Sequence, residues 1–234
     1  MNVITFTDKY VNTYLIPIED GWCLVDTGYP QQEKKFWKRL AEKKIEPKDI
    51  KYVFLTHHHA DHAGYLASVL KKTGAQLISA EGNRLRLAAG KNDMQTYVSS
   101  FGMLILSKLS VAFVGLTQCF PPVTAEAISP TDQPLEKYGI TFKVLKGHTE
   151  CDVVMQAGEK LFCGDLLMSG AGASKHAPIW IKNKFEMVKS WEKIQKMPGI
   201  KTIYPGHGKP FSVSVLPDAI KVWKDRGALS LNSK

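Results

Sequence analysis

The sequence predicts one large α/β domain in which strands and helices pack as layers. Short apolar runs typical of strands alternate with stretches whose apolar residues recur at helical spacing. The 234 residues, 44% of them hydrophobic, are enough to bury a sizeable core. We therefore expect a single domain over residues 1–234, with a helical insertion at about 90–120.

The first half of the chain begins with three strand-like stretches, at 3–6, 13–18 and 22–25, with residues 19–21 as a hairpin turn. Pro30 suits the start of a helix, and the apolar face that follows consists of Phe36, Trp37, Leu40 and Ala41. The apolar run 52–55 is typical of a buried strand. A second helical stripe over 65–70 ends near Gly74 and precedes a short strand at 76–79.

The second half continues the alternation. Strands are expected at 141–145, 160–163 and 201–204. Asn183, with Glu186 three residues later, resembles a capping box at the start of a helix. The residues of that helix expected to face inward are Met187, Val188, Trp191 and Ile194.

The insertion carries apolar residues at helical spacing over 94–116. Lys108 and several serines interrupt it, which argues against a membrane span. Three interpretations remain open: core packing or a homodimer contact, a lid that shapes an apolar substrate pocket, and docking on a membrane surface.

Four of the seven histidines lie within six residues, at positions 57–62, directly after the apolar run 52–55. Alternate residues of an extended chain point the same way, so His57 and His59 should share one side. His58 should point the opposite way and be structural or exposed to solvent. Neutral imidazoles and the nearby Asp61 suit zinc, iron or manganese.

Three later segments each place one candidate ligand beside glycine after a strand-like run. They are Gly147-His148-Thr149, Cys163-Gly164-Asp165 and Pro205-Gly206-His207-Gly208. Glycine permits tight turns and close backbone approach. The pattern predicts that these ligands converge with the cluster at 57–62.

Together with Asp26-Thr27-Gly28, these motifs resemble those of the metallo-β-lactamase-fold hydrolase superfamily, and Asp61-His62 matches its glyoxalase II and lactonase pattern. The resemblance implies a four-layer αββα sandwich with a dinuclear metal centre at one edge. By position it implies the following ligands: His57, His59 and His148 for the first metal, Asp61, His62 and His207 for the second, and Asp165 as a bridge. It also implies that Asp26 supports the ligands from beneath. Many true β-lactamases differ at Asp61-His62, which counts against antibiotic hydrolysis.

The function expected from this resemblance is a metal-dependent hydrolase, dinuclear, that uses a metal-bound hydroxide on a small ester, lactone or thioester. We expect two divalent ions, zinc first, with iron or manganese as alternatives. Asp61 is the catalytic candidate, orienting the nucleophile and passing a proton to the leaving group. Lys175 and His176, in a loop rich in glycine and alanine, are candidates for substrate contact. Only 27 residues follow His207, which favours a lactone or simple ester over a glutathione thioester.

Two other functions stay open. A persulfide-dioxygenase-like oxidoreductase with one iron would share His57, His59, His148 and Asp165. A phosphodiesterase or nuclease would suit the net charge of +9, of which an excess of seven basic residues lies within 177–234. No aromatic strand platform is evident, so a small molecule, anionic or apolar, is expected rather than nucleic acid.

The four cysteines show no framework spacing, which fits free thiols in a reducing compartment. No charged leader with an apolar core opens the sequence, so we expect a cytoplasmic protein. Cys151 stands near a position where the family commonly has glycine, and we expect it to be a small packing residue.

Overall fold

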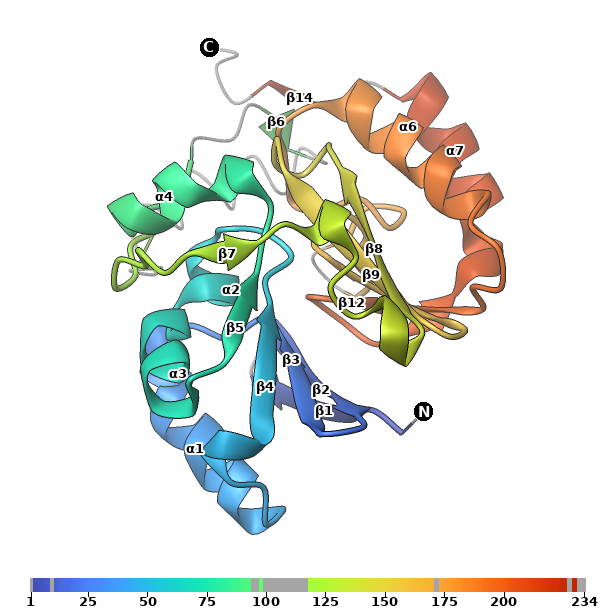
Figure 1. The fold of residues 1–234 in the computed structure, drawn as a ribbon. Helices are drawn as coiled ribbons and strands as arrows, with labels where there is room; N and C mark the ends of the chain where they lie inside the picture. The colour runs from blue at the N-terminus through green and yellow to red at the C-terminus, as the bar shows by residue number, and fades with distance from the viewer. Residues whose placement is uncertain are drawn as a thin grey trace.

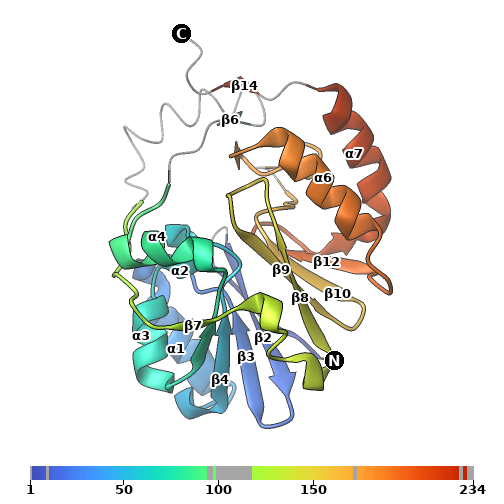
Figure 2. The same ribbon diagram turned by 45° about the horizontal axis from the view of Figure 1, so that its top comes forward.

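The computed structural model describes residues 2–8, 11–93, 97–98, 118–170, 173–226 and 229–230. Figure 1 shows two sheets side by side, one from the first half of the chain and one from the second. Helices lie on the outer side of each sheet, and the same arrangement is visible after rotation in Figure 2. The described elements therefore form the layered α/β architecture that the alternating pattern predicts.

The first sheet has, among the described residues, six strands in the order β1-β2-β3-β4-β5-β7. Their bounds are Ile4–Asp8, Val11–Ile18, Gly21–Val25, Ile50–Phe54, Gln76–Ile78 and Ala127–Ile128. The strands β1, β2 and β3 are antiparallel, whereas β3, β4, β5 and β7 are parallel.

The second sheet has, in the described part, five strands in the order β13-β12-β10-β9-β8. Their bounds are Phe211–Ser212, Thr202–Pro205, Lys160–Gly164, Asp152–Ala157 and Ile140–Leu145. The neighbours β8 and β9 are antiparallel, as are β9 and β10, while β10 and β12 are parallel. Consequently β8, β10 and β12 run in the same direction and end at the same edge.

A third, smaller sheet joins distant segments in the order β11-β6-β14, with bounds Trp180–Ile181, Tyr97–Val98 and Leu229–Ser230. The described α-helices are α1 Glu33–Glu42, α2 Ala60–Ala63, α3 Leu66–Thr73, α4 Arg84–Ala89, α6 Lys184–Gln195 and α7 Leu216–Asp225. Short 3-10 turns occur at η1 Pro30–Gln32, η2 Pro47–Asp49, η3 Glu81–Asn83, η4 Pro130–Asp132, η5 Glu136–Tyr138 and η6 Val213–Val215.

Alternate strand residues define four layers. On the first sheet, Leu15 and Leu24 pack against α1 and α3, whereas their neighbours Tyr14 and Val25 face the second sheet. On the second sheet, residues such as Leu161 pack against α6 and α7. The central strands are therefore covered on both faces, which explains the nearly continuous burial of β2, β9 and β10.

Helix α6 begins as predicted, because the Asn183 side chain accepts hydrogen bonds from the backbone N–H groups of Phe185 and Glu186. The Glu186 carboxylate pairs with Lys189 instead of closing the predicted capping box. The four residues expected to face inward are buried: Met187, Val188, Trp191 and Ile194.

The predicted helix over 94–116 lies outside the described residues, except for the short strand β6. Close to it, Asn92 N–H donates to the Gln118 carbonyl at 2.9 Å and Phe120 N–H donates to the Gly90 carbonyl at 2.9 Å. The described residues that flank the segment, 90–92 and 118–120, thus lie side by side. Among the helices that the structure describes, none has the length and apolarity needed to cross a bilayer.

Trp191 offers a test of the packing between α6 and the second sheet. It is fully buried, and its indole N–H donates to the Leu166 carbonyl at 2.8 Å. We expect Trp191→Phe to lower the free energy of unfolding by about 2–4 kcal/mol, because it leaves a cavity and an unpaired carbonyl. Denaturant unfolding measures this change.

The matched control is Trp37→Phe. The Trp37 indole donates to Glu33 on the partly exposed surface of α1 at 2.9 Å. Water can replace that hydrogen bond, so the loss should be about 1 kcal/mol or less. Equal losses in the two variants would contradict the assignment of Trp191 as a buried anchor.

Candidate metal centre

Four strand ends deliver the candidate ligands to one edge of the two sheets. The loop after β4 carries the histidines at 57–62, and the ends of β8, β10 and β12 carry His148, Asp165 and His207. Hydrogen bonds between the sheets fix these ends, with Val153 N–H donating to the Thr56 carbonyl at 2.9 Å. The ligands that the sequence predicts to converge are thereby brought together.

Three imidazole nitrogens form the first cluster. His57 Nε2 lies 3.1 Å from His59 Nδ1. His148 Nε2 lies 3.2 Å from His57 Nε2 and 3.0 Å from His59 Nδ1. Tetrahedral zinc with bonds of about 2.0–2.1 Å separates its nitrogen ligands by about 3.3 Å. The triangle therefore has nearly the dimensions of three ligands of one metal ion.

In each of these three rings, the nitrogen that points away from the shared centre faces a hydrogen-bond acceptor. His148 Nδ1 lies 2.9 Å from the Trp180 carbonyl, and His59 Nε2 lies 3.1 Å from Asp93 Oδ1. His57 Nδ1 lies 3.1 Å from Thr56 Oγ1, whose own proton goes to Asp26. Since a neutral imidazole carries one proton, these contacts leave three lone pairs directed at one another.

Burial keeps the first cluster neutral. It lowers the pKa of His59 to about 4, against the opposing effect of the Asp93 hydrogen bond. Burial, followed by the neighbouring histidines, lowers the pKa of His57 well below its usual range, and burial also lowers that of His148. A neutral imidazole is the form that binds metals.

The second cluster contains Asp61, His62, Asp165 and His207. His207 Nε2 lies 3.1 Å from Asp61 Oδ2 and 3.3 Å from Asp165 Oδ2. His62 Nε2 lies 3.2 Å from Asp165 Oδ1. Asp165 Oδ2 is also 3.8 Å from His148 Nε2, so this carboxylate lies between the two clusters.

Two atoms of the second cluster are buried without a hydrogen-bond partner among the described residues: His62 Nε2 and Asp165 Oδ1. His62 Nδ1 contacts Asp26 Oδ2 at 2.8 Å, so Nε2 is the ring nitrogen that faces Asp165. Against the effect of burial, Asp165, Asp61 and Asp26 raise the pKa of His62 well above its usual range, so Nε2 and Asp165 Oδ1 favour a positive charge between them, either a proton or a metal cation. The donor set fits a divalent metal.

The charges of the second cluster support the same conclusion. Burial alone would lower the pKa of His207, but the nearby carboxylates of Asp165 and Asp61 raise it to about 10. Against the effect of burial, His62 and His207 lower the pKa of Asp61 to about 2. These carboxylates favour positive charge beside them, which a divalent cation would provide.

Asp26 lies beneath both clusters and is 2% exposed. It accepts hydrogen bonds from Thr56 N–H at 2.8 Å and from the Thr56 hydroxyl at 2.7 Å, in addition to its contact with His62. Its φ of +56° is the left-handed region, which aspartate tolerates better than most residues. Asp26 thus contacts His62 directly and the Thr56 hydroxyl beside His57.

Several polar residues of the site were missed by sequence reasoning. Asn12 donates to the carbonyls of Pro205 and Gly208, and the Tyr14 hydroxyl donates to Pro205 at 2.6 Å. Both anchor the loop of His207, but neither stands in a recognisable motif. Asp152 accepts from the backbone N–H groups of His148 and Thr149 at 3.0 Å, and its position four residues after His148 was a usable signal.

His58 is 4% exposed and lies between Asn83 and Asp93. The solvent-exposed alternative for this residue is therefore wrong. Cys151 is half-buried against Gly82, where an added Cβ would collide with its sulfur. Its position is that of a small packing residue.

The predicted substrate loop has its own packing. Lys175 and His176 have φ values of +50° and +67° at a tight turn that pairs Ser174 with Ala177. The His176 ring stacks on Phe211 at 4.4 Å between centroids, and its Nδ1 lies 3.0 Å from the Met168 carbonyl. Lys175 is exposed. Contact of either residue with substrate stays a prediction.

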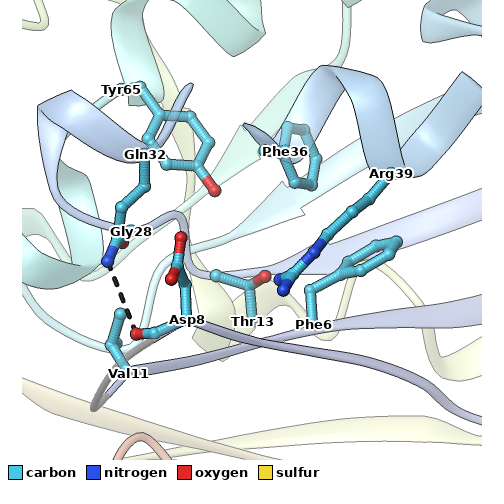
Figure 3. A pocket seen from close by; sticks show the side chains of 9 residues that line it. All are labelled: Phe6, Asp8, Val11, Thr13, Gly28, Gln32, Phe36, Arg39 and Tyr65. Atoms are coloured by element: carbon cyan, nitrogen blue, oxygen red, sulfur yellow. Dashed lines mark hydrogen bonds between the residues drawn. The ribbon is translucent and has the colours of Figure 1, made fainter. Parts of the chain in front are cut away.

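A cavity lies between β1, β2 and α1 (Figure 3), lined by residues including Phe6, Thr13, Phe36 and Tyr65. On its rim, Gln32 donates to the Asp8 carbonyl at 3.4 Å. Its volume of about 10 Å³ has room for about one water molecule. It is too small to be a substrate pocket.

Two curated hydrolases are similar to this chain in sequence. A hydroxyacylglutathione hydrolase of Albidiferax ferrireducens is 26% identical over 70% of this chain and 49% of its own length. The probable metallo-hydrolase YqjP of Bacillus subtilis is 25% identical over 82% of this chain and 66% of its own. This chain thus spans about half to two thirds of these relatives.

The fold has clear counterparts among solved structures. The subclass B3 metallo-beta-lactamase BJP-1 of Bradyrhizobium japonicum superposes with a TM-score of 0.64 at 20% identity, covering 96% of this chain and 89% of that one. The predicted sandwich is thereby confirmed. The family model of the metallo-beta-lactamase superfamily matches residues 6–207, so the chain belongs to that superfamily.

Proposed function

We propose that the protein is a dinuclear metallohydrolase acting on a small carboxylic ester, lactone or thioester. The observation that carries the proposal is the pair of donor clusters that share Asp165, each with its lone pairs directed inward. His57, His59 and His148 would hold one ion. Asp61, His62 and His207 would hold the other, with Asp165 between them. The donors are all nitrogen and oxygen, which suits zinc and also iron or manganese.

A bound divalent ion would make hydroxide available near neutral pH and polarise a substrate carbonyl. The protein's own contribution is to position protons. The side chains of Asp61 and His207 are each 15% exposed, against 0% for His62 and 1% for His148. Asp61 therefore stands on the solvent side of the centre, where a carboxylate can orient a nucleophile and pass a proton to a leaving group.

The substrate class rests on the ligand pattern and the relatives. Asp61-His62 in the second cluster differs from many β-lactamases, which favours esters, lactones and thioesters over antibiotics. One relative is named a hydroxyacylglutathione hydrolase, so glutathione thioesters belong in the same test. The basic surface would favour an anionic substrate over a neutral one.

The proposal is tested by metal analysis of protein purified without added zinc, followed by a panel of lactones, esters, thioesters and phosphodiesters. We expect about two ions per chain and turnover of at least one carboxylic substrate that a chelator abolishes. Stoichiometric iron with oxygen consumption would identify an oxygenase instead. Activity confined to phosphodiesters, with salt-dependent nucleic-acid binding, would also refute the proposal.

Gly206 provides a test of the metal centre that replaces none of the proposed ligand residues. A Cβ added there would lie 2.5 Å from Asp165 Oδ1 and 2.5 Å from His62 Cε1. We expect Gly206→Ala to displace both ligands and lower zinc affinity by about 10–100-fold, the range typical of disturbed ligand support. Competition with a chromophoric chelator measures the affinity.

Gly139→Ala is the control. An added Cβ at Gly139 meets nothing within 4 Å, although its φ of +70° adds about 1–2 kcal/mol of backbone strain. This variant should lose some stability and keep its zinc. Full zinc affinity in Gly206→Ala would contradict the assignment of Asp165 and His62 as ligands.

Asp61→Asn tests the proton role. Asparagine keeps an oxygen ligand but cannot carry a proton between nucleophile and leaving group. We expect kcat to fall by about 10²–10⁴-fold, the range of general acid–base catalysis, while both metals remain bound. A variant with both metals and full turnover would eliminate this role for Asp61.

A further inference from the structure

Asp93 lies outside every motif recognised in the sequence, yet it contacts two histidines of the metal loop. Its Oδ1 lies 3.1 Å from His59 Nε2 and 3.2 Å from His58 Nε2. Its Oδ2 lies 3.3 Å from Lys182 Nζ, and the Asp93 side chain is 5% exposed. A carboxylate held among three donors and nearly removed from water is a fixed acceptor.

His59 differs from the other two histidines of the first cluster. It turns Nδ1 toward the shared centre, whereas His57 and His148 turn Nε2. This orientation requires the ring proton to stay on Nε2, since a proton on Nδ1 would occupy the lone pair needed for a metal. The Nε2 proton of His59 is then donated to Asp93 Oδ1.

The chain around Asp93 also grips the metal loop. The preceding residue, Asn92, accepts a hydrogen bond from Ala60 N–H at 2.8 Å, at the start of α2. Asn92 N–H in turn donates to the Gln118 carbonyl at 2.9 Å. Residues 92–93 therefore hold both the helix that carries Asp61 and the ring of His59.

The donor atoms of His58, His59 and Asp93 lie within 4.8 Å of one another, which is close enough for the three residues to hold a metal ion of their own. The Lys182 ammonium group already provides a cation beside Asp93. In addition, His58 Nδ1 faces Asn83 Oδ1 at 3.0 Å, while the Asn83 amide nitrogen donates to Ser79 Oγ. Both nitrogens of His58 thus face acceptors, which is the arrangement of a hydrogen-bond donor, not of a metal ligand.

We propose that Asp93 is a positioning residue for the first metal, holding the His59 proton on Nε2 so that Nδ1 is presented to the ion. Lys182 and His58 fix the carboxylate in place. This inference rests on the proposed metal centre but not on the substrate. Through its contact with His59, Asp93 would support the first cluster and not the second.

The test measures zinc binding by each cluster separately. His207→Ala removes a ligand of the second cluster, so zinc binding in that background reports the first cluster. His148→Ala removes a ligand of the first cluster, so zinc binding in that background reports the second. Asp93→Ala is added to each background, and zinc affinity is measured by competition with a chromophoric chelator. We expect a loss of about 10–100-fold in the His207→Ala background and a change below about threefold in the His148→Ala background.

Two further variants sharpen the result. Asp93→Asn keeps an oxygen that can accept the His59 proton, so we expect it to recover most of the affinity lost in Asp93→Ala. Asp132→Asn, at an exposed aspartate in η4, is the matched control and should change neither affinity. The visible spectrum of cobalt(II) in the His207→Ala background should change with Asp93→Ala and not with Asp132→Asn.

Unchanged affinity of the first cluster in Asp93→Ala would overturn the proposal. So would equal losses in both clusters accompanied by lower stability of the metal-free protein, because a general structural role would produce that result. The titration uses zinc alone. A protein that binds zinc through Asp93-dependent His59 but hydrolyses no carboxylic substrate would refute the proposed function and leave this inference standing.

Discussion

The two sheets meet at a buried contact between His62 Nε2 and Asp165 Oδ1, which lie 3.2 Å apart. Against the effect of burial, Asp165, Asp61 and Asp26 raise the pKa of His62 well above its usual range, so without a metal a proton can bridge the two atoms. A divalent cation would take the place of that proton and satisfy both atoms. Metal binding and stability are then linked, since an ion that binds only the folded state stabilises it.

This centre exists only where the two sheets meet. The first sheet supplies the loop after β4, and the second supplies His148, Asp165 and His207 from three strands that end at one edge. Hydrogen bonds that cross between the halves hold the ends in register, with Asn12 N–H donating to the Gly206 carbonyl at 2.7 Å. Neither half contains a complete set of donors for both clusters, so the packing of the sheets is itself a condition for the site.

Local signals in the sequence predicted the alternating strands and helices and the polar residues at strand ends, whereas the four-layer sandwich and the ligand set were implied by the resemblance of the motifs to a known superfamily. Strands and helices have characteristic apolar periods, and glycine beside a polar residue at a strand end marks a tight functional turn. Asp93 and Asn12 could not be found in this way. Each is an ordinary polar residue whose partners, His59 and the His207 loop, are distant in sequence. The burial of His58 depends on Asn83 and Asp93, which only the tertiary structure brings to it.

The two carboxylates behind the histidines act differently. Asp26 Oδ2 contacts His62 directly and reaches His57 through the Thr56 hydroxyl, so one carboxylate orients a histidine in each cluster. It adopts a left-handed backbone conformation, which costs on the order of 1 kcal/mol. Asp93 contacts only His59 among the first cluster's rings, and Lys182 offsets its charge. Asp26 therefore couples the two clusters, whereas Asp93 adjusts one of them. Such an arrangement would allow the first site to be tuned at Asp93 without disturbing the carboxylate on which both sites rely.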